Sequence, residues 1–252
     1  MKNREYTVIY RKKESDMNYL IYGEDRRHAY LSALLTNAGM TMQAPADLLI
    51  LSPRESIVSH TDDIKEEGLV FGGPAGDNSF LKEHGYRKLT QSDAFRRKNS
   101  EYTAEGALSI AITETTTALC DTPVALLGYG YLGKACARLF SRIGAPVTVY
   151  TENPGERAGA VVDGFPSKEL TSLSDLSGML LLNTIPFPVL DSLFLSATDA
   201  PAVLIELASV PCITKEVAGL RLVPAGALPS RFMPASAATL MFEEITAQIK
   251  KE

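Results

Sequence analysis

Three glycines between an apolar run and a helix-like run limit the possible folds of this chain more than any other feature. In VALLGYGYLGKACARLFSRIG, Gly128, Gly130 and Gly133 have GxGxxG spacing. The apolar run predicts a buried strand. Gly128 allows a tight turn, Gly130 lets a pyrophosphate approach the backbone, and Gly133 lets the next helix pack on the sheet. N–H groups at the start of that helix, around Tyr131 and Leu132, would face the phosphates. The motif therefore predicts a dinucleotide-binding turn.

The residues after the next apolar run bear on which dinucleotide is bound. Val147–Tyr150 predicts the second strand, and Thr151, Glu152 and Asn153 follow it. Glu152 lies 19 positions after Gly133, close to where an acidic residue bonds the ribose hydroxyls of NAD and repels the 2′-phosphate of NADP. Alternatively, Thr151 faces the ribose, or Glu152 only solvates a loop. The predicted cofactor is thus NADP or NAD.

Three further apolar runs alternate with helix-like segments and predict a parallel sheet. They span 178–186, 202–209 and 220–229. Ligands collect where the strands of such a sheet end. We therefore expect residues at two of these ends to line the cofactor edge, namely Asn183, Thr184, Ile185, Pro186, Ala208 and Ser209. For residues 183–186 the alternative is a simple turn.

The length of 252 residues suits two domains. Apolar runs at 17–22, 46–53 and 68–74, with helical patterns at 26–39 and 78–85, predict a smaller α/β layer. We predict an N-terminal α/β domain over residues 1–101 and a doubly wound parallel sheet over 102–252. A helix over 103–118, capped by Thr103, is expected to connect them. The amphipathic segment SAATLMFEEITAQIKK is expected to form the C-terminal helix of the second domain.

Composition excludes several classes of protein. A net charge of -5 argues against a nucleic-acid surface, and the basic runs at 10–14 and 95–99 are typical of solvated faces. No apolar run reaches the roughly 18 residues that span a bilayer, and the start of the chain is too polar for a signal peptide. We expect a cytoplasmic protein without membrane contact. Cys120, Cys136 and Cys212 lack CxxC spacing, so neither a disulfide framework nor a metal site is expected.

Five ordered segments from Asn99 onward are more specific than the glycine motif. NSEYTAEGALSIAI, VALLGYGYLG, LLNTIPFPVL, LIELAS and LVPAGALPSRFMPASAA together resemble the A subunit of dipicolinate synthase. In the first part, IYGEDRR and VFGGP are similar in place and type to the family's N-terminal strand ends. The resemblance implies a flavodoxin-like N-terminal domain and a Rossmann domain related to those of the D-2-hydroxyacid dehydrogenases.

The resemblance also implies an activity. The family oxidises a dihydrodipicolinate-type dicarboxylate to dipicolinate and passes hydride to NADP, together with a flavoprotein-like B subunit, in the mother cell during spore formation. A small dicarboxylate substrate and a partner of the B type are therefore expected. The sequence leaves open whether the chain also forms a homo-oligomer.

The chain departs from the family where positive charge is expected. Tyr131 stands where the family has an arginine, and Glu152 replaces an arginine suited to the 2′-phosphate. The motif LASRPGG reads LASVPCI at 207–213, and Ala235 stands for a lysine. Each lost charge-assisted bond is worth about 1.5–3 kcal/mol. Two alternatives therefore stay open: a non-catalytic nucleotide- or partner-binding relative, and an NAD-dependent dehydrogenase or reductase of another small acid.

Oxidation of a dihydropyridine ring needs a hydride acceptor and cationic groups that hold two carboxylates. Arg26, after the first strand, and Arg231 are candidates because a guanidinium is a planar fork. Thr103 and Glu105 fall on the TAEG motif, where the alternatives are contact with substrate or cofactor and helix capping.

Histidine and glutamate positions refine this prediction. The histidines at 28, 60 and 84 all lie in the first third of the chain. A D-2-hydroxyacid dehydrogenase mechanism, with its histidine late in the Rossmann domain, is therefore disfavoured. Glu206 either orients the loop behind the nicotinamide or is a buried carboxylate that accepts local backbone N–H bonds.

Overall fold

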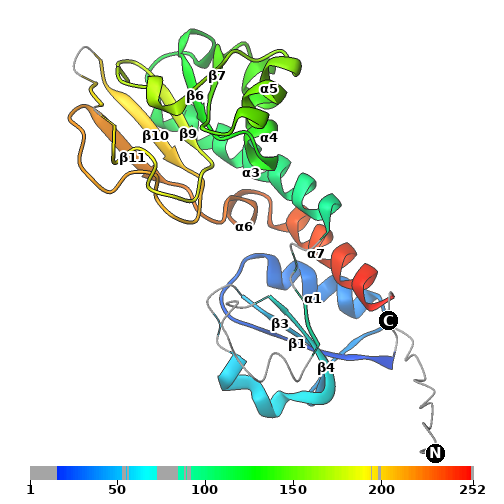
Figure 1. Cartoon of the computed structure of the whole chain (residues 1–252). Helices are drawn as coiled ribbons and strands as arrows, with labels where there is room; N and C mark the ends of the chain where they lie inside the picture. Colours follow the sequence, from blue (N-terminus) through cyan, green and yellow to red (C-terminus); the bar gives the residue numbers. More distant parts are fainter. Residues whose placement is uncertain are drawn as a thin grey trace, which may run out of the picture. The chain divides into compact units, whose positions relative to one another are not determined.

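The computed structural model describes residues 16–52, 55, 57–72, 85–87, 89, 92–193, 195–197 and 200–250 (Figure 1). The chain divides into two compact units. Unit 1 comprises Met1–Phe95 and Pro234–Glu252, and unit 2 comprises Arg96–Met233. The helix predicted at 78–85 and the end of the strand predicted at 68–74 fall largely outside the described residues.

Unit 1 contains a parallel sheet in the order β2-β1-β3-β4-β5. Its strands are β1 (Asn18–Tyr22), β2 (Thr41–Met42), β3 (Ala46–Leu51), β4 (Ile64–Gly72) and β5 (Gly85–Arg87). β3 is almost entirely apolar because nearly all of its residues are buried. The order is that of flavodoxin-like sheets, which confirms the predicted fold of this part of the chain.

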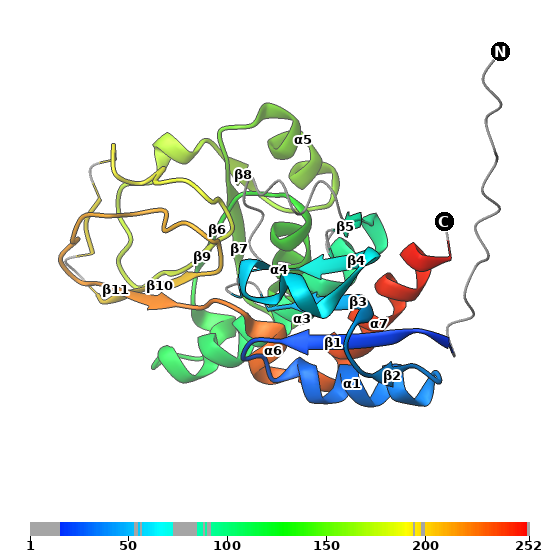
Figure 2. The same cartoon turned by 90° about the horizontal axis from the view of Figure 1, so that it is seen from below.

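The C-terminal helix α7 (Pro234–Ile249) belongs to unit 1, where it contacts α1 (Arg27–Asn37) (Figures 1 and 2). The buried carboxylate of Glu244 accepts hydrogen bonds from the backbone N–H and the hydroxyl of Ser92. The prediction that placed this helix in the second domain, 102–252, is therefore wrong. An amphipathic stripe shows that a helix is half-buried, but not which sheet it covers.

Helix α3 (Asp93–Glu114) is longer than predicted and contains the division between the units, at Phe95 and Arg96. It begins ten residues before the predicted start of 103, because the hydroxyl of Ser92 accepts the N–H of Phe95 and caps the helix. Thr103 is inside the helix, where its hydroxyl donates to the carbonyl of Asn99 at 2.8 Å. This back-bonding accommodates threonine in a helix interior, so the predicted capping role of Thr103 is wrong.

Unit 2 contains a parallel sheet in the order β11-β10-β9-β6-β7-β8. Its strands are β6 (Val124–Leu127), β7 (Val147–Tyr150), β8 (Ser167–Lys168), β9 (Leu180–Asn183), β10 (Ala202–Glu206) and β11 (Leu220–Pro224). Counted from β6, this is the 3-2-1-4-5-6 order of the Rossmann fold, read from the opposite edge. The predicted doubly wound sheet is confirmed.

Both faces of the unit 2 sheet are buried, as alternate residues of β6 show. Val124 and Leu126 pack in one core with α4 (Tyr131–Arg142), whereas Ala125 and Leu127 pack in a second core on the other face. Full burial of a leucine is worth about 1.5–3 kcal/mol. The two cores therefore fix β6 at the centre of the sheet and hold the glycine turn at its carboxyl end. In the described part of the chain, no helix has the length and apolar character that a membrane crossing requires.

Candidate functional site

A pocket of about 350 Å³ lies at the carboxyl ends of β6, β7 and β9. This is the edge at which parallel sheets bind ligands, and the volume is within the range of small-molecule sites. Its lining includes most of the predicted cofactor residues: Gly128, Gly130, Tyr131, Leu132, Thr151, Glu152, Asn153, Thr184, Ile185 and Pro186.

The three motif glycines meet different surroundings. Gly128 has φ +87°, and a Cβ there would lie 2.7 Å from the hydroxyl of Thr184. A Cβ on Gly133 would lie 2.3 Å from the carbonyl oxygen of Gly128, so α4 packs directly on the turn. A Cβ on Gly130 would meet no atom of the described residues within 4 Å. The open space in front of Gly130, next to the first N–H groups of α4, fits a pyrophosphate.

Two arginines approach the first residue of α4. The guanidinium carbons of Arg96 and Arg97, both exposed on α3, lie 5.0 and 5.2 Å from the ring centroid of Tyr131. Such cation–π contacts contribute about 0.5–1 kcal/mol each at exposed sites. The basic run at 95–99 is therefore more than a solvated face, because it places positive charge beside a residue of the pocket.

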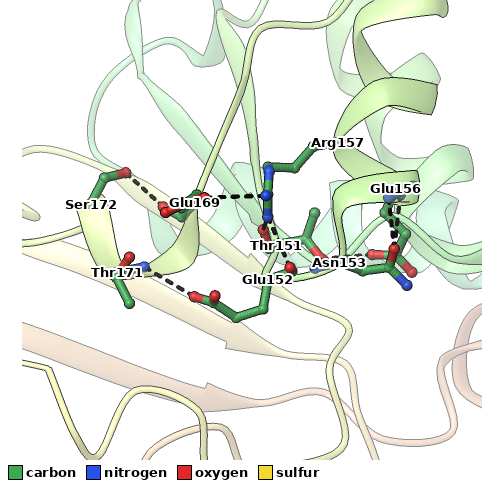
Figure 3. A network of polar contacts seen from close by, with 9 residues as sticks. Thr151, Glu152, Asn153, Glu156, Arg157, Glu169, Thr171 and Ser172 are labelled. Atoms are coloured by element: carbon green, nitrogen blue, oxygen red, sulfur yellow. Dashed lines mark hydrogen bonds and ion pairs between the residues drawn. The ribbon is translucent and has the colours of Figure 1, made fainter.

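The end of β7 is held by a polar network (Figure 3). Asn153 caps α5 (Pro154–Val162), and its side chain accepts the N–H groups of Gly155 and Glu156. Arg157 donates to the carbonyls of Thr151 and Glu152, at 2.9 Å each. Residues 151–153 thus form a short connection between the end of β7 and the start of α5 at Pro154.

Two carboxylates of this network line the pocket, and they have different partners. Glu152 accepts the N–H of Thr171 at 3.2 Å. Glu156 accepts the backbone N–H of Tyr129 at 3.0 Å and the hydroxyl of Thr151 at 2.8 Å. Glu156 therefore ties α5 to the glycine turn. Sequence reasoning missed it, although Asn153 followed by proline is a helix-start signal that places Glu156 in the first turn.

Asn183, predicted to bond ribose or nicotinamide, is fully buried and bonds its own surroundings. Its amide accepts the N–H of Ile185 and donates to the carbonyl of Ile185 and to Glu206, the latter at 2.6 Å. Glu206 is also buried and accepts the N–H groups of Ala208 and Cys212. The prediction that Glu206 is a buried carboxylate that accepts local backbone N–H bonds is thus confirmed. The side chain of Asn183 stabilises the turn that places Thr184 at the pocket.

The remaining predicted site residues lie apart from this pocket. Gly133, Asn183, Ala208 and Ser209 are near the strand ends but outside its lining. Glu105 lines a separate hollow with Arg138 and Arg142, between α3 and α4. Arg231 is exposed at the end of α6 (Leu228–Phe232), with its guanidinium carbon 5.4 Å from the Phe232 ring centroid. Arg26 is exposed at the start of α1 in unit 1.

Two cysteine thiols of unit 2 have raised pKa values and stay neutral. Burial raises the pKa of the Cys136 thiol to about 12. Burial and the nearby Glu206 carboxylate raise the pKa of Cys212. A thiol held neutral is a poor nucleophile and metal ligand. Among the described residues, no group of three histidine, cysteine, aspartate or glutamate side chains is placed to hold a metal ion.

No model of a known protein family matches the chain. The A subunit of dipicolinate synthase from Bacillus subtilis is 25% identical over 284 residues, which cover 99% of this chain and 94% of that protein. The chain resembles this relative along its whole length. The predicted resemblance is therefore confirmed and extends well beyond the segments that first indicated it.

Solved structures agree on the fold. The A subunit of dipicolinate synthase from Bacillus halodurans has a TM-score of 0.75 at 20% identity, over 92% of this chain and 97% of that one. D-lactate dehydrogenase of Escherichia coli has a TM-score of 0.63 at 12% identity, over 93% and 97%. The predicted relationship to the fold of D-2-hydroxyacid dehydrogenases is confirmed.

Proposed function

We propose that this chain is an oxidoreductase of the dipicolinate synthase A type. In this proposal it binds a nicotinamide dinucleotide at the glycine turn and dehydrogenates a dihydrodipicolinate-type dicarboxylate to dipicolinate. The whole-chain similarity and the dehydrogenase fold support an oxidoreductase role. The observation that carries the cofactor assignment is the open space at Gly130, between two glycines that admit no side chain.

The chain's own groups would bind and orient the dinucleotide. The N–H groups at the start of α4, near Tyr131 and Leu132, would hold the pyrophosphate. Thr184, whose hydroxyl donates to the carbonyl of Leu127 at 2.7 Å, would bound the nicotinamide side of the pocket together with Ile185 and Pro186. The dinucleotide, when bound, supplies the hydride acceptor.

The substrate's carboxylates need cations, and the pocket lining contains neither lysine nor arginine among the described residues. Arg26 and Arg231 are the proposed ligands, since both are exposed and offer a planar guanidinium. A flavoprotein-like B subunit is the proposed partner. The proposed location is the cytoplasm of the mother cell.

The test is an assay of this chain together with its proposed partner. The chain is purified with the B subunit of a dipicolinate synthase, the pair is supplied with dihydrodipicolinate and NADP or NAD, and dipicolinate is measured by chromatography. At the same low cofactor concentration, we expect much less product with Gly130→Val than with the wild-type chain. Failure to form product would refute the proposed activity, and failure to bind either dinucleotide in a parallel titration would refute the cofactor assignment as well.

A non-catalytic relative is the second candidate, and the charge of the pocket favours it. Two carboxylates and, among the described residues, no cation line the pocket, whereas an anionic cofactor and a dicarboxylate would meet there. In this case the protein binds a dinucleotide, whether or not a B-type partner is present, but releases no dipicolinate. The same assay therefore separates the two candidates.

A further inference from the structure

We propose that the Glu156 carboxylate accepts hydrogen bonds from the adenosine ribose hydroxyls and that this residue makes the pocket select NAD over NADP. The proposal rests on the dinucleotide binding proposed above and deepens it. The sequence points to Glu152 for this role, because of its spacing from the glycine motif. The side-chain contacts point to Glu156 instead.

Glu156 is fixed in place from two directions. It lies in the first turn of α5, whose start is capped by Asn153, three residues after the end of β7. One carboxylate oxygen, Oε2, accepts both the N–H of Tyr129, inside the glycine turn, and the hydroxyl of Thr151. These two bonds join the carboxyl ends of β6 and β7, which is where the adenosine ribose of a Rossmann cofactor lies. The carboxylate is therefore ordered before any ligand arrives.

The second oxygen of Glu156, Oε1, bonds to no residue that the structure describes, and Glu156 is only half-buried. It lines the pocket together with Gly128, Gly130 and Thr151. An ionised carboxylate is purely a hydrogen-bond acceptor, whereas ribose hydroxyls are donors. An acceptor fixed at this position fits the 2′- and 3′-hydroxyls of NAD.

Glu152 is placed differently. Its carboxylate reaches away along the sheet edge and accepts the N–H of Thr171, while its carbonyl accepts from Arg157 (Figure 3). Glu152 is exposed and adds negative charge at the rim of the pocket. It does not bond the glycine turn, so it is less suited than Glu156 to hold the ribose.

A 2′-phosphate would find no compensating cation in the described lining. Among the labelled residues of Figure 3, only Arg157 carries a positive charge. Its guanidinium already bonds two backbone carbonyls and, at 3.2 Å, the carboxylate of Glu169. A phosphate monoester carries about -1.5 to -2 charges at pH 7. It would therefore approach two carboxylates, and like charges at this range disfavour binding.

The experiment is a pair of fluorescence titrations, with NADH and with NADPH, on the full chain at fixed ionic strength. The variants are Glu156→Gln, which keeps an acceptor oxygen for Tyr129 and removes the charge, and Glu156→Asp, which keeps the charge. Glu216→Gln is the matched control, because it makes the same charge change at an exposed residue outside the pocket lining. A thermal scan of each variant checks that it folds.

We expect wild type, Glu216→Gln and Glu156→Asp to prefer NADH. Glu156→Gln should shift the ratio of the two dissociation constants toward NADPH by about tenfold, or about 1.4 kcal/mol. An unchanged ratio in folded Glu156→Gln, or a shift in Glu152→Gln only, would overturn this assignment and leave the dinucleotide proposal intact. If neither dinucleotide binds the wild-type chain, the dinucleotide proposal fails, and the role of Glu156 fails with it.

Discussion

Substitution of Gly130 by valine tests whether the open space in the glycine turn is a binding site. Gly130 has φ -74° and ψ -160°, a conformation open to any residue, and a Cβ there has no described atom within 4 Å. The free energy of unfolding should change by no more than about 1 kcal/mol. The added side chain occupies the space proposed for the pyrophosphate, so overpacking in the complex should cost about 1–3 kcal/mol. Dinucleotide affinity should fall roughly 5- to 150-fold.

Gly133→Ala is the matched control, because it changes stability at the same turn for a different reason. The new Cβ would lie 2.3 Å from the carbonyl oxygen of Gly128, so α4 and the turn must separate. We expect the free energy of unfolding to fall by about 1–3 kcal/mol. Urea denaturation gives the stability of each variant, and NADH and NADPH fluorescence gives its affinity. Wild-type affinity in folded Gly130→Val would refute the reasoning.

Three further predictions concern residues around the sheet ends. Arg96→Ala combined with Arg97→Ala should weaken dinucleotide binding at low salt and have less effect at high salt, because exposed charges are screened; titrations at two ionic strengths measure this. Glu206→Ala leaves three donors unbonded and should lower the free energy of unfolding by about 3 kcal/mol or more, whereas Glu206→Gln should cost less, as urea denaturation would show. Burial and the Asp163 carboxylate raise the pKa of Tyr129 above its ordinary value of 10.0. The unfolded chain therefore loses the phenolic proton at a lower pH than the folded chain, and the free energy of unfolding should fall as the pH rises above about 10. Tyr129→Phe should make this pH dependence shallower. Equal slopes for wild type and Tyr129→Phe would contradict the last prediction.

The strands of unit 2 could be predicted because buried strands appear in the sequence as continuous apolar runs. β6 and β9 are apolar at nearly every position, since the sheet is covered on both faces. The glycine spacing then fixes where the turn and α4 begin. Local pattern was sufficient here because each signal depends on neighbouring residues only.

The start of α3 could not be found in the same way. Threonine is a common N-cap residue, but the hydroxyl of Thr103 donates to the carbonyl of Asn99 four residues earlier, and the helix continues through it. Ser92, the actual cap, is followed by Asp93, which is favourable in a first turn. Both residues are good caps locally, and only the packed structure selects one.

The carboxylate at the glycine turn was missed for a different reason. Spacing rules count from the last glycine to the strand end and therefore point to Glu152. The role of Glu156 depends on α5 beginning at Pro154, because the first turn of this helix brings the Glu156 carboxylate back toward Tyr129. Asn153 and Pro154 signal the start of this helix, but the contact between Glu156 and Tyr129 joins two separate segments, and local spacing does not show it.

The division of the chain has a consequence for the order in which the protein is synthesised. Unit 2, Arg96–Met233, is one continuous segment, so all of it has been made before α7 follows. Unit 1 needs α7 to cover α1, and α7 is the last helix of the described chain to be made. During translation, unit 2 can therefore fold before α7 is available to pack on α1 of unit 1. Loss of α7 would leave the lining of the unit 2 pocket unchanged and would expose the side of α1 that α7 covers in unit 1.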